Sequence, residues 1–167
     1  GTLAARSTTS GYVEFLGAGG FTVGTVNSIM GGCFTTTVGV TTNNGAITIT
    51  GCISSSDLGN IPETINGLPV TQIGDWSFYF CHSLNQLTIP VTVTNIGQYA
   101  FYSCPLLTNV TIGGNITNTV TTIGQEAFGN CGLLAKVTIG NNVVSVGSSA
   151  FFYCRSLANV IIGNSVT

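Results

Sequence analysis

The sequence repeats one pattern four times between residues 73 and 162. The clearest column consists of cysteines separated by 23, 27 and 23 residues: Cys81, Cys104, Cys131 and Cys154. The same steps separate an Ile-Gly or Val-Gly pair that begins at residues 73, 96, 123 and 146, and a column of phenylalanines, Phe78, Phe101, Phe128 and Phe151. A unit of this length cannot bury its apolar side alone, so the units must stack on one another as a solenoid.

Each repeat divides into two extended pieces and a turn. The piece Leu-x-x-Leu/Val-x-Ile ends in the two-residue alternation of a short strand. A Pro or Gly then predicts a turn, and Val-x-x-Ile-Gly predicts a second extended piece. The piece Ala-Phe-x-x-Cys predicts a single helical or 3₁₀ turn that points these three side chains inward. We therefore expect a β-rich solenoid of short parallel strands and single helical turns, with the Phe and Cys columns forming ladders in its core.

The combined pattern Ile-Gly-x-x-Ala-Phe-x-x-Cys-x-x-Leu-x-x-Val-Thr-Ile resembles the BspA-like leucine-rich-repeat family of bacterial and protist surface proteins. Residues 61–74, Ile-Pro-Glu-Thr-Ile-Asn-Gly-Leu-Pro-Val-Thr-Gln-Ile-Gly, also resemble the segment with which repeats of this family usually begin. The resemblance covers residues 45–167. It implies a right-handed leucine-rich-repeat coil, surface display, adhesion or protein binding, and no catalytic residues.

Two segments are expected along the chain. Residues 1–44 contain three stretches of strand character and predict an N-terminal β-strand arm or cap. Asn43-Asn44-Gly45 predicts a hairpin turn into the first strand of the solenoid. The solenoid then occupies residues 45–167, with an irregular first unit at 45–81, units at 82–104, 105–131 and 132–154, and a partial unit at 155–167.

The chain carries few charges. Only three of its 167 residues are Lys or Arg and five are Asp or Glu, whereas about a quarter of the residues in typical soluble domains are charged. Three cations cannot neutralise the phosphates of a nucleic acid, so that partner is excluded. No run of about 18 apolar residues occurs, so no membrane span is expected. The small titratable inventory argues against an enzyme, and no cofactor is expected.

Six cysteines in a chain poor in lysine favour an extracellular or cell-surface location. The four cysteines of the repeat column are expected to pack as small buried hydrophobes, with stacked disulfides as the alternative. No metal site is expected, because no ligands are grouped as closely as in Cys-x₂-Cys. Cys33 and Cys52 lie outside the column, where the sequence allows either a disulfide between them or two unpaired thiols.

Three other candidate sites have simpler explanations. His82 follows Cys81, but no third group orients a nucleophile pair, so we expect a surface histidine at a turn. Asp75 and Glu126 occupy different positions in repeats that are two units apart. Their carboxyl groups are therefore expected to lie too far from each other to act as an acid–base pair. Two outward rows of threonines could order water for ice binding, although threonine packing between strands is the simpler explanation; the rows are Thr88, Thr111 and Thr138, and Thr71, Thr94 and Thr121.

Aromatic residues next to the inward Phe column are expected to emerge along one edge of the solenoid as a contact surface. They are Trp76, Tyr79, Phe80, Tyr99, Tyr102, Phe152 and Tyr153. Partial burial of these side chains within the solenoid is the alternative.

The last predicted strand, Val160-Ile161-Ile162, is followed by no polar cap and is a candidate assembly end, although a cut longer protein would look the same. We expect a non-catalytic extracellular or cell-surface structural protein that associates with other copies of itself, end to end, into a filament or surface layer. The alternative is an adhesin-like module that binds a host or matrix protein.

Overall fold

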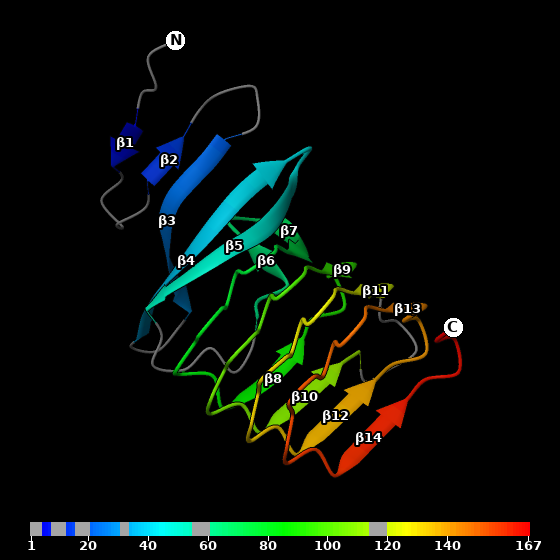
Figure 1. The fold of residues 1–167 in the computed structure, drawn as a ribbon. Coiled ribbons are helices and arrows are strands. Elements are labelled where there is room, and N and C mark those ends of the chain that lie inside the picture. Colours follow the sequence, from blue (N-terminus) through cyan, green and yellow to red (C-terminus); the bar gives the residue numbers. More distant parts are fainter. Residues whose placement is uncertain (1–4, 8–12, 16–20, 31–33, 55–60, 114–119) are drawn as a thin grey trace.

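The computed structural model describes the chain except for residues 1–4, 8–12, 16–20, 31–33, 55–60 and 114–119. Two long sheets run side by side along the molecule (Figure 1). The smaller has four strands in the order β14-β12-β10-β8. These are β8 (Gln86–Ile89), β10 (Asn109–Ile112), β12 (Lys136–Ile139) and β14 (Asn159–Ile162). We call this the four-stranded sheet.

All strands of the four-stranded sheet are parallel, and equivalent residues of successive repeats lie opposite one another. Val110 pairs with Leu87 on one side and with Val137 on the other. Each strand alternates inward and outward side chains, so the pairing places like residues in rows along the solenoid. The parallel coil of short strands expected from the repeat is therefore confirmed.

The larger sheet has the strand order β13-β11-β9-β7-β5-β4-β3, with β6 paired to β7 off this path. Its strands are β3 (Phe21–Met30), β4 (Phe34–Asn43), β5 (Ala46–Ser54), β6 (Thr64–Ile65), β7 (Leu68–Ile73), β9 (Asn95–Ile96), β11 (Thr122–Ile123) and β13 (Ser145–Val146). Strands β5, β7, β9, β11 and β13 are parallel, whereas β3 and β4 add to β5 as antiparallel strands. A separate antiparallel pair consists of β1 (Ala5–Ser7) and β2 (Val13–Phe15).

The hairpin between β4 and β5 turns at Asn44 and Gly45, which both have positive φ, of 49° and 76°. Asn43 pairs with Ala46 across the turn. Two positive-φ residues joining antiparallel strands are typical of a type I′ turn, for which Asn-Gly is the favoured sequence. The predicted hairpin is confirmed, and it leads directly into β5, the first strand to pair in parallel with the repeats.

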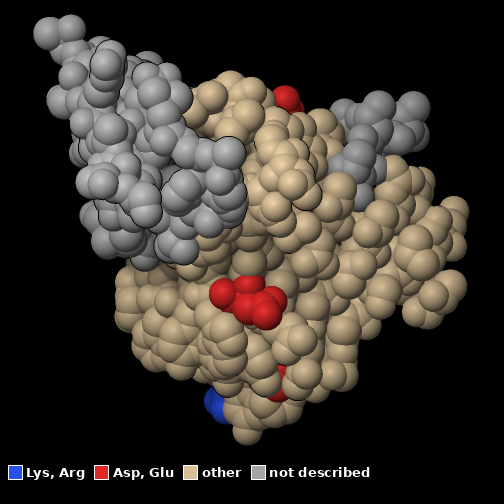
Figure 2. Space-filling view, turned by 90° about the horizontal axis from the view of Figure 1, so that it is seen from above, with Lys and Arg blue, Asp and Glu red and all other residues tan. Residues whose placement is uncertain are grey.

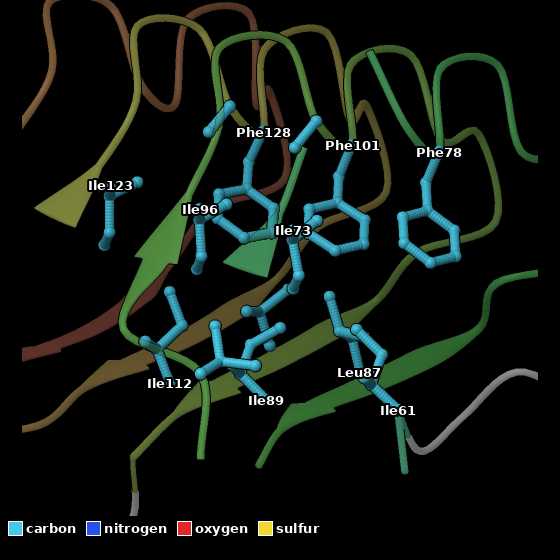
Figure 3. Close-up of a cluster of buried hydrophobic side chains, with 14 of the residues drawn as sticks. Ile61, Ile73, Phe78, Leu87, Ile89, Ile96, Phe101, Ile112, Ile123 and Phe128 are labelled. Carbon is cyan, nitrogen blue, oxygen red and sulfur yellow. The ribbon is translucent and has the colours of Figure 1, made fainter. Parts of the chain in front are cut away.

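The core lies between the two sheets and contains one file of phenylalanine rings (Figure 3). Phe101 is stacked on Phe78 at 4.9 Å and on Phe128 at 5.1 Å between ring centroids, and Phe128 is stacked on Phe151 at 5.4 Å. The first three rings are at most 2% exposed. Rows of Leu, Val and Ile from both sheets pack around this file, so every coil buries its apolar side against its neighbours.

The prediction of a helical or 3₁₀ turn at Ala-Phe-x-x-Cys is wrong. In the described part of the chain these segments are successive β-turns, and no helix is present. Each segment has two non-glycine residues with positive φ, such as Trp76 at 59° and Phe80 at 57° in the first coil. A residue in the left-handed region ends a right-handed helical run, so each segment turns twice within a few residues.

Backbone hydrogen bonding gives the physical reason for these turns. The N–H of Phe78 donates to the carbonyl of Ala100 at 2.7 Å, and the N–H of Phe101 donates to the carbonyl of Ala127 at 2.7 Å. Residues two positions before and after each Phe bond to the next coil in the same way. A helix would use these N–H groups within its own turn and leave adjacent coils unconnected there. The double turn instead joins the coils along this edge.

Candidate protein-binding surface

The double turns form one edge of the solenoid, which we call the turn edge. It comprises residues 75–83 of the first coil and the equivalent residues 98–106, 125–133 and 148–156 of the next three. Large apolar side chains on this edge are each about half exposed, with fractions between 47% and 52%; they are Trp76, Tyr79, Phe80, Leu106, Leu133, Phe152 and Tyr153. So much apolar surface along one edge is typical of a contact region.

Four rings of the first two coils form an ordered group, which we call the aromatic cluster. Trp76 stacks on Tyr99 with 4.1 Å between centroids and 12° between planes, and Tyr79 stacks on Tyr102 at 5.8 Å and 9°. The two stacks meet edge to face, at 5.3 Å in the first coil and 5.6 Å in the second. Each such pair contributes roughly 0.5–1.5 kcal/mol beyond its buried area, so the cluster is ordered before any partner binds.

The third coil ends both stacks. Glu126 stands where Tyr99 stands in the second coil, and its Oε1 accepts a hydrogen bond of 3.2 Å from the Tyr99 hydroxyl. The Tyr102 ring leans over Gly129, where an added Cβ would lie only 2.8 Å from a ring carbon. Glu126 therefore holds the Tyr99 ring by a hydrogen bond, and Gly129 leaves the space that the Tyr102 ring occupies. Neither residue adds a further ring to its stack.

The fourth coil carries a second apolar group on the same edge. Phe152 and Tyr153 are 4.6 Å apart, and the Arg155 guanidinium lies 4.8 Å from the centre of the Tyr153 ring. The first coil has an equivalent pair, Phe80 and His82, at 5.5 Å. At the positions equivalent to Phe80 and His82, the two middle coils have small or polar residues. Large side chains therefore lie at both ends of the turn edge, and its middle is lower. The residues of the middle coils are Ser103, Pro105, Asn130 and Gly132.

Leu106 and Leu133 belong to the turn edge but were missed from the sequence. Each precedes a core leucine, Leu107 or Leu134, that is completely buried. The signal was the doubled Leu-Leu, because only the second leucine matches the core column and the first must point away from it. Equivalent positions in the first and fourth coils hold serine, so this apolar contribution is confined to the middle coils.

Charge is sparse around this surface. Figure 2 shows one face of the molecule, where acidic groups and a basic group form small separate spots on a surface that is otherwise without charged side chains. Asp75 and Glu126 lie at the border of the turn edge next to the larger sheet, and Arg155 lies in the fourth coil near the opposite border. The edge therefore offers mainly aromatic and aliphatic contacts, with a few charges at its margins.

The Cys column lies just inside the turn edge, and none of its four cysteines is part of a disulfide. The Sγ of Cys104 donates to the carbonyl of Phe78 at 3.3 Å, and those of Cys131 and Cys154 bond to the equivalent carbonyls of their preceding coils at 3.2 and 3.1 Å. Contact with the Cys131 thiol and burial raise the pKa of Cys104, while burial raises the pKa of Cys154 to about 11. These thiols act as small core residues that also bond the coils together. The possible Cys33–Cys52 disulfide lies outside what the structure describes.

We expect the thiols of this column to resist alkylation in the native chain. Cys104 and Cys131 are fully buried, and a pKa of about 11 leaves only about one part in a thousand of Cys154 as thiolate near pH 8. Iodoacetamide treatment followed by peptide mass spectrometry should find these three residues unmodified, with full modification in guanidinium chloride as the control. Rapid modification of Cys104 or Cys131 in the native chain would contradict the stacked core.

Two of the remaining candidates have structural roles, namely Asp75 and one of the two threonine rows. No group of three or more His, Cys, Asp or Glu side chains suited to a metal occurs among the described residues. Asp75 accepts a 2.8 Å hydrogen bond from the Gln98 N–H, so it joins two coils rather than pairing with Glu126. The hydroxyls of Thr94 and Thr121 donate to carbonyls of the preceding coils at 3.0 and 3.2 Å. That row of threonines therefore bonds coil to coil.

Strand β14 leaves apolar side chains uncovered. Val160 and Ile162 are 46% and 55% exposed, whereas their counterparts Val137 and Ile139 in β12 are 0% and 2% exposed. Ile161 on the outward face is also 55% exposed. The difference arises because β14 is the last strand of its sheet and no further coil packs on it. None of the described segments forms a helix that could cross a membrane.

Comparison with known proteins places this architecture in a family. Residues 51–167 match the BspA type leucine rich repeat region, in six copies. A leucine-rich repeat protein from Bacteroides capillosus is 26% identical with a TM-score of 0.63, over 76% of this chain and 93% of that one. A leucine rich cell surface protein from Faecalibacterium prausnitzii is 31% identical with a TM-score of 0.52, over 79% of this chain and 42% of that one.

The leucine-rich repeat protein of T. pallidum is also 31% identical, with a TM-score of 0.53 over 74% of this chain and 66% of the other. No curated protein sequence matches the chain significantly. The family match covers more than half of the sequence, and it coincides with the stacked coils, their parallel strands and their Phe and Cys columns. The chain therefore belongs to the BspA-type leucine-rich-repeat family.

Proposed function

We propose that the chain is a non-catalytic extracellular or cell-surface protein that binds another protein through its turn edge. One observation carries the proposal: seven large apolar side chains, each about half exposed, lie along a single edge of a regular solenoid. Trp and Tyr are the residue types that most often dominate binding energy at protein interfaces. The likeness to a protein described as a cell surface protein supports the location.

The order of the aromatic cluster supports the same role. Stacked rings held by Glu126 and Gly129 lose little side-chain freedom on binding, and preorganisation of this kind strengthens association. The double turns beneath the rings are fixed by hydrogen bonds to neighbouring coils, so the edge is presented by a firm backbone. We also propose that residues 1–44 cap the solenoid of residues 45–167, which the pairing of β4 with β5 supports.

Binding to host proteins tests this proposal. Fibronectin, laminin and collagen are immobilised, and the chain is passed over them in biolayer interferometry. We expect Trp76→Asn combined with Tyr79→Ser to weaken any binding that occurs by about tenfold or more. Asn suits position 76 because it tolerates the positive φ of 59° there.

The matched control is Lys136→Ala combined with Thr138→Ala, which changes two outward side chains of β12 on the four-stranded sheet. We expect it to leave binding unchanged. Binding that survives the turn-edge variant and is lost in the sheet variant would assign the interaction to the four-stranded sheet and reject the turn edge.

A second candidate function is end-to-end association of copies into a filament or surface layer. The exposure of Val160, Ile161 and Ile162 supports it, because these side chains would be covered by a further coil whether from the same chain or from another. For a chain of these 167 residues, light scattering and electron microscopy would detect concentration-dependent filaments. We expect Ile162→Thr to reduce them, and monodisperse particles at all concentrations would exclude this mode.

A further inference from the structure

We infer that a single segment of a partner protein lies across the middle of the turn edge, with a basic residue at one end, an acidic residue at the other and apolar residues between them. The inference rests on the proposed function, because it takes the turn edge as a protein-binding surface and adds the chemistry and the orientation of the partner. A segment of this kind matches the edge in charge, in shape and in polarity.

Charges of opposite sign lie at opposite borders of the turn edge. Asp75 and Glu126 lie at the border next to the larger sheet, while Arg155 lies near the border from which the chain continues into the four-stranded sheet. Lys136, the first residue of β12, is exposed just beyond that second border. The strip between the borders, residues 77–81 and their equivalents in the other coils, contains no charged residue. The edge is therefore negative along one side and positive along the other.

These charges are not neutralised within the described part of the chain, where no ion pair joins them. Asp75 uses one carboxylate oxygen to accept the N–H of Gln98, and so keeps the other for a partner. Glu126 likewise uses one oxygen to accept the hydroxyl of Tyr99. The guanidinium of Arg155 lies against an aromatic ring and has no carboxylate beside it. Charges around an apolar centre select and orient a partner more than they add affinity.

The side chains of the edge leave room for a segment across its middle. Phe80 lies at the first-coil end, Phe152 and Tyr153 lie at the fourth-coil end, and all three are about half exposed. Between them, a Cβ added at Gly132 would meet nothing within 4 Å. The first and fourth coils are three strand spacings apart, which is about 14 Å. Once the side chains at both ends are allowed for, this width suits one helix or one strand, each about 10 Å across.

The floor of this lower middle is apolar. Leu106 and Leu133, which belong to the two middle coils, are 49% and 51% exposed. The ring of Tyr102 in the second coil leans over Gly129 in the third. Apolar side chains at the centre of a partner segment would cover these groups and remove them from water, which is the main source of affinity at such a contact.

The third coil sets the direction of the charges along the segment. Glu126 lies at the start of its double turn, and Lys136 follows the end of that turn. A segment across the middle passes from one to the other, so it would place a basic residue beside Glu126 and an acidic residue beside Lys136. Arg155 lies one coil away, about 5 Å along the solenoid, and strengthens the second contact.

Other occupants match this pattern less well. A segment that ran along the edge would have to pass over Phe80 at one end and over Phe152 and Tyr153 at the other. A neutral glycan would leave the charges at both borders unmatched. A polypeptide supplies residues of both signs, with apolar residues between them, within one short stretch.

A phage-displayed library of random short peptides, selected on the immobilised 167-residue chain, tests the inference. We expect the enriched peptides to carry Lys or Arg towards one end and Asp or Glu towards the other, with apolar residues between. Either order along the peptide is expected, because a short peptide can cross the edge in both directions.

A synthetic copy of an enriched peptide is then titrated against variants of the chain by fluorescence anisotropy. Lys136→Glu combined with Arg155→Glu should weaken binding about tenfold or more, because the acidic end of the peptide then meets two carboxylates. Glu126→Lys should weaken it about fivefold or more. A peptide whose basic residue is replaced by Glu should regain binding to the Glu126→Lys variant.

The matched control is Glu63→Lys, which changes the net charge as Glu126→Lys does. Glu63 is exposed and lies outside the turn edge, so we expect unchanged binding. The Lys136→Glu/Arg155→Glu variant decides the test if Glu126→Lys fails to fold, since Glu126 also bonds to Tyr99. An absence of enriched peptides overturns the inference. So do enriched peptides without opposite charges at their ends, and peptides that bind Lys136→Glu/Arg155→Glu as tightly as the unchanged chain.

The proposed function has a separate outcome. If the peptides overturn the inference while binding to an immobilised matrix protein is still lost in Trp76→Asn/Tyr79→Ser, the turn edge remains a protein-binding surface and its partner is not oriented by charge. If neither peptides nor matrix proteins bind in a way that depends on the turn edge, both proposals are wrong.

Discussion

Replacing Gly124 with alanine should destabilise the chain by more than about 3 kcal/mol, because the added methyl group has no room between two coils. A Cβ at this position would lie 2.6 Å from the carbonyl carbon of Gly97 and 2.7 Å from the nitrogen of Gln98. Both contacts are with backbone, which cannot rotate away, so the third coil would have to move off the second. Urea unfolding followed by circular dichroism measures the loss.

The control for this variant is Gly132→Ala, in the same coil. An added Cβ at Gly132 meets nothing within 4 Å. Glycine-to-alanine changes at unstrained positions usually alter stability little or raise it slightly, through the unfolded chain. We therefore expect a change within about 0.5 kcal/mol. Equal unfolding midpoints for the two variants would show that the coils do not approach as closely as the structure has them.

The second large effect is expected from Phe101→Ala. Phe101 is completely buried and lies between the rings of Phe78 and Phe128, at 4.9 and 5.1 Å. Removing the ring forfeits its own burial and leaves a gap in the middle of the file, which coils bonded on both sides cannot collapse to fill. Substitutions of this kind cost about 3–5 kcal/mol. Thermal and urea unfolding would both report it.

Phe152→Ala serves as the comparison, since Phe152 is the residue next to the Phe file in the fourth coil and is 50% exposed. Its removal should change stability by less than about 1 kcal/mol. A large loss in both variants would mean that the turn edge is part of the core, and similar small losses would mean that the file of rings is not its centre.

Much of the fold could be predicted because a stacked architecture makes equivalent residues identical in role. Three columns with the same steps, together with the alternation of the Leu-x-x-Leu/Val-x-Ile piece, showed which side chains face inward and located the strands to within a residue or two. The Asn44-Gly45 turn was also predictable, because its local chemistry selects one turn type regardless of the rest of the chain. The columns were informative because they repeat with the same steps, and the turn was informative because its conformation depends only on neighbouring residues.

The conformation of the turns was not predictable from the same columns. Ala-Phe-x-x-Cys has the spacing of a helical turn, and Trp, Phe, Tyr and Glu are residues that rarely adopt positive φ. They adopt it here because N–H groups at alternate residues bond to the next coil. That preference is set by the neighbouring coil and is invisible in a single repeat. The glycines of the Ile-Gly column are also explained only by the neighbouring coil, because they lie where the backbones of adjacent coils touch.

The candidate surface was also predictable from the sequence only in part. The sequence located exposed aromatic residues beside the Phe column, because side chains next to an inward position must leave the core. It did not give the stacking of Trp76 on Tyr99 or the lean of Tyr102 over Gly129, which depend on the offset between coils. Leu106 and Leu133 were hidden by their core neighbours. The sequence therefore showed which residues each coil presents, but not how the side chains of adjacent coils pack on one another.

The arrangement shows how a chain with few charges can vary one edge of its surface. Stacked coils supply a firm backbone, and each turn can carry a different side chain outward without altering the core beneath it. Variation of the turn residues from Tyr102 to Gly129 to Phe152 changes the surface, while the neighbouring Phe file stays the same. The exposed side chains of this edge can thus change by substitution at little cost in stability.

The nuclear Overhauser effects of the Phe101 ring test the stacked-coil account most directly. Selective labelling of phenylalanine would resolve its ring protons. Contacts from Phe101 to both Phe78 and Phe128, with none from Phe78 directly to Phe128, are the predicted result, because the three rings follow one another in a single file. Rings without mutual contacts, or Phe78 in direct contact with Phe128, would contradict the account.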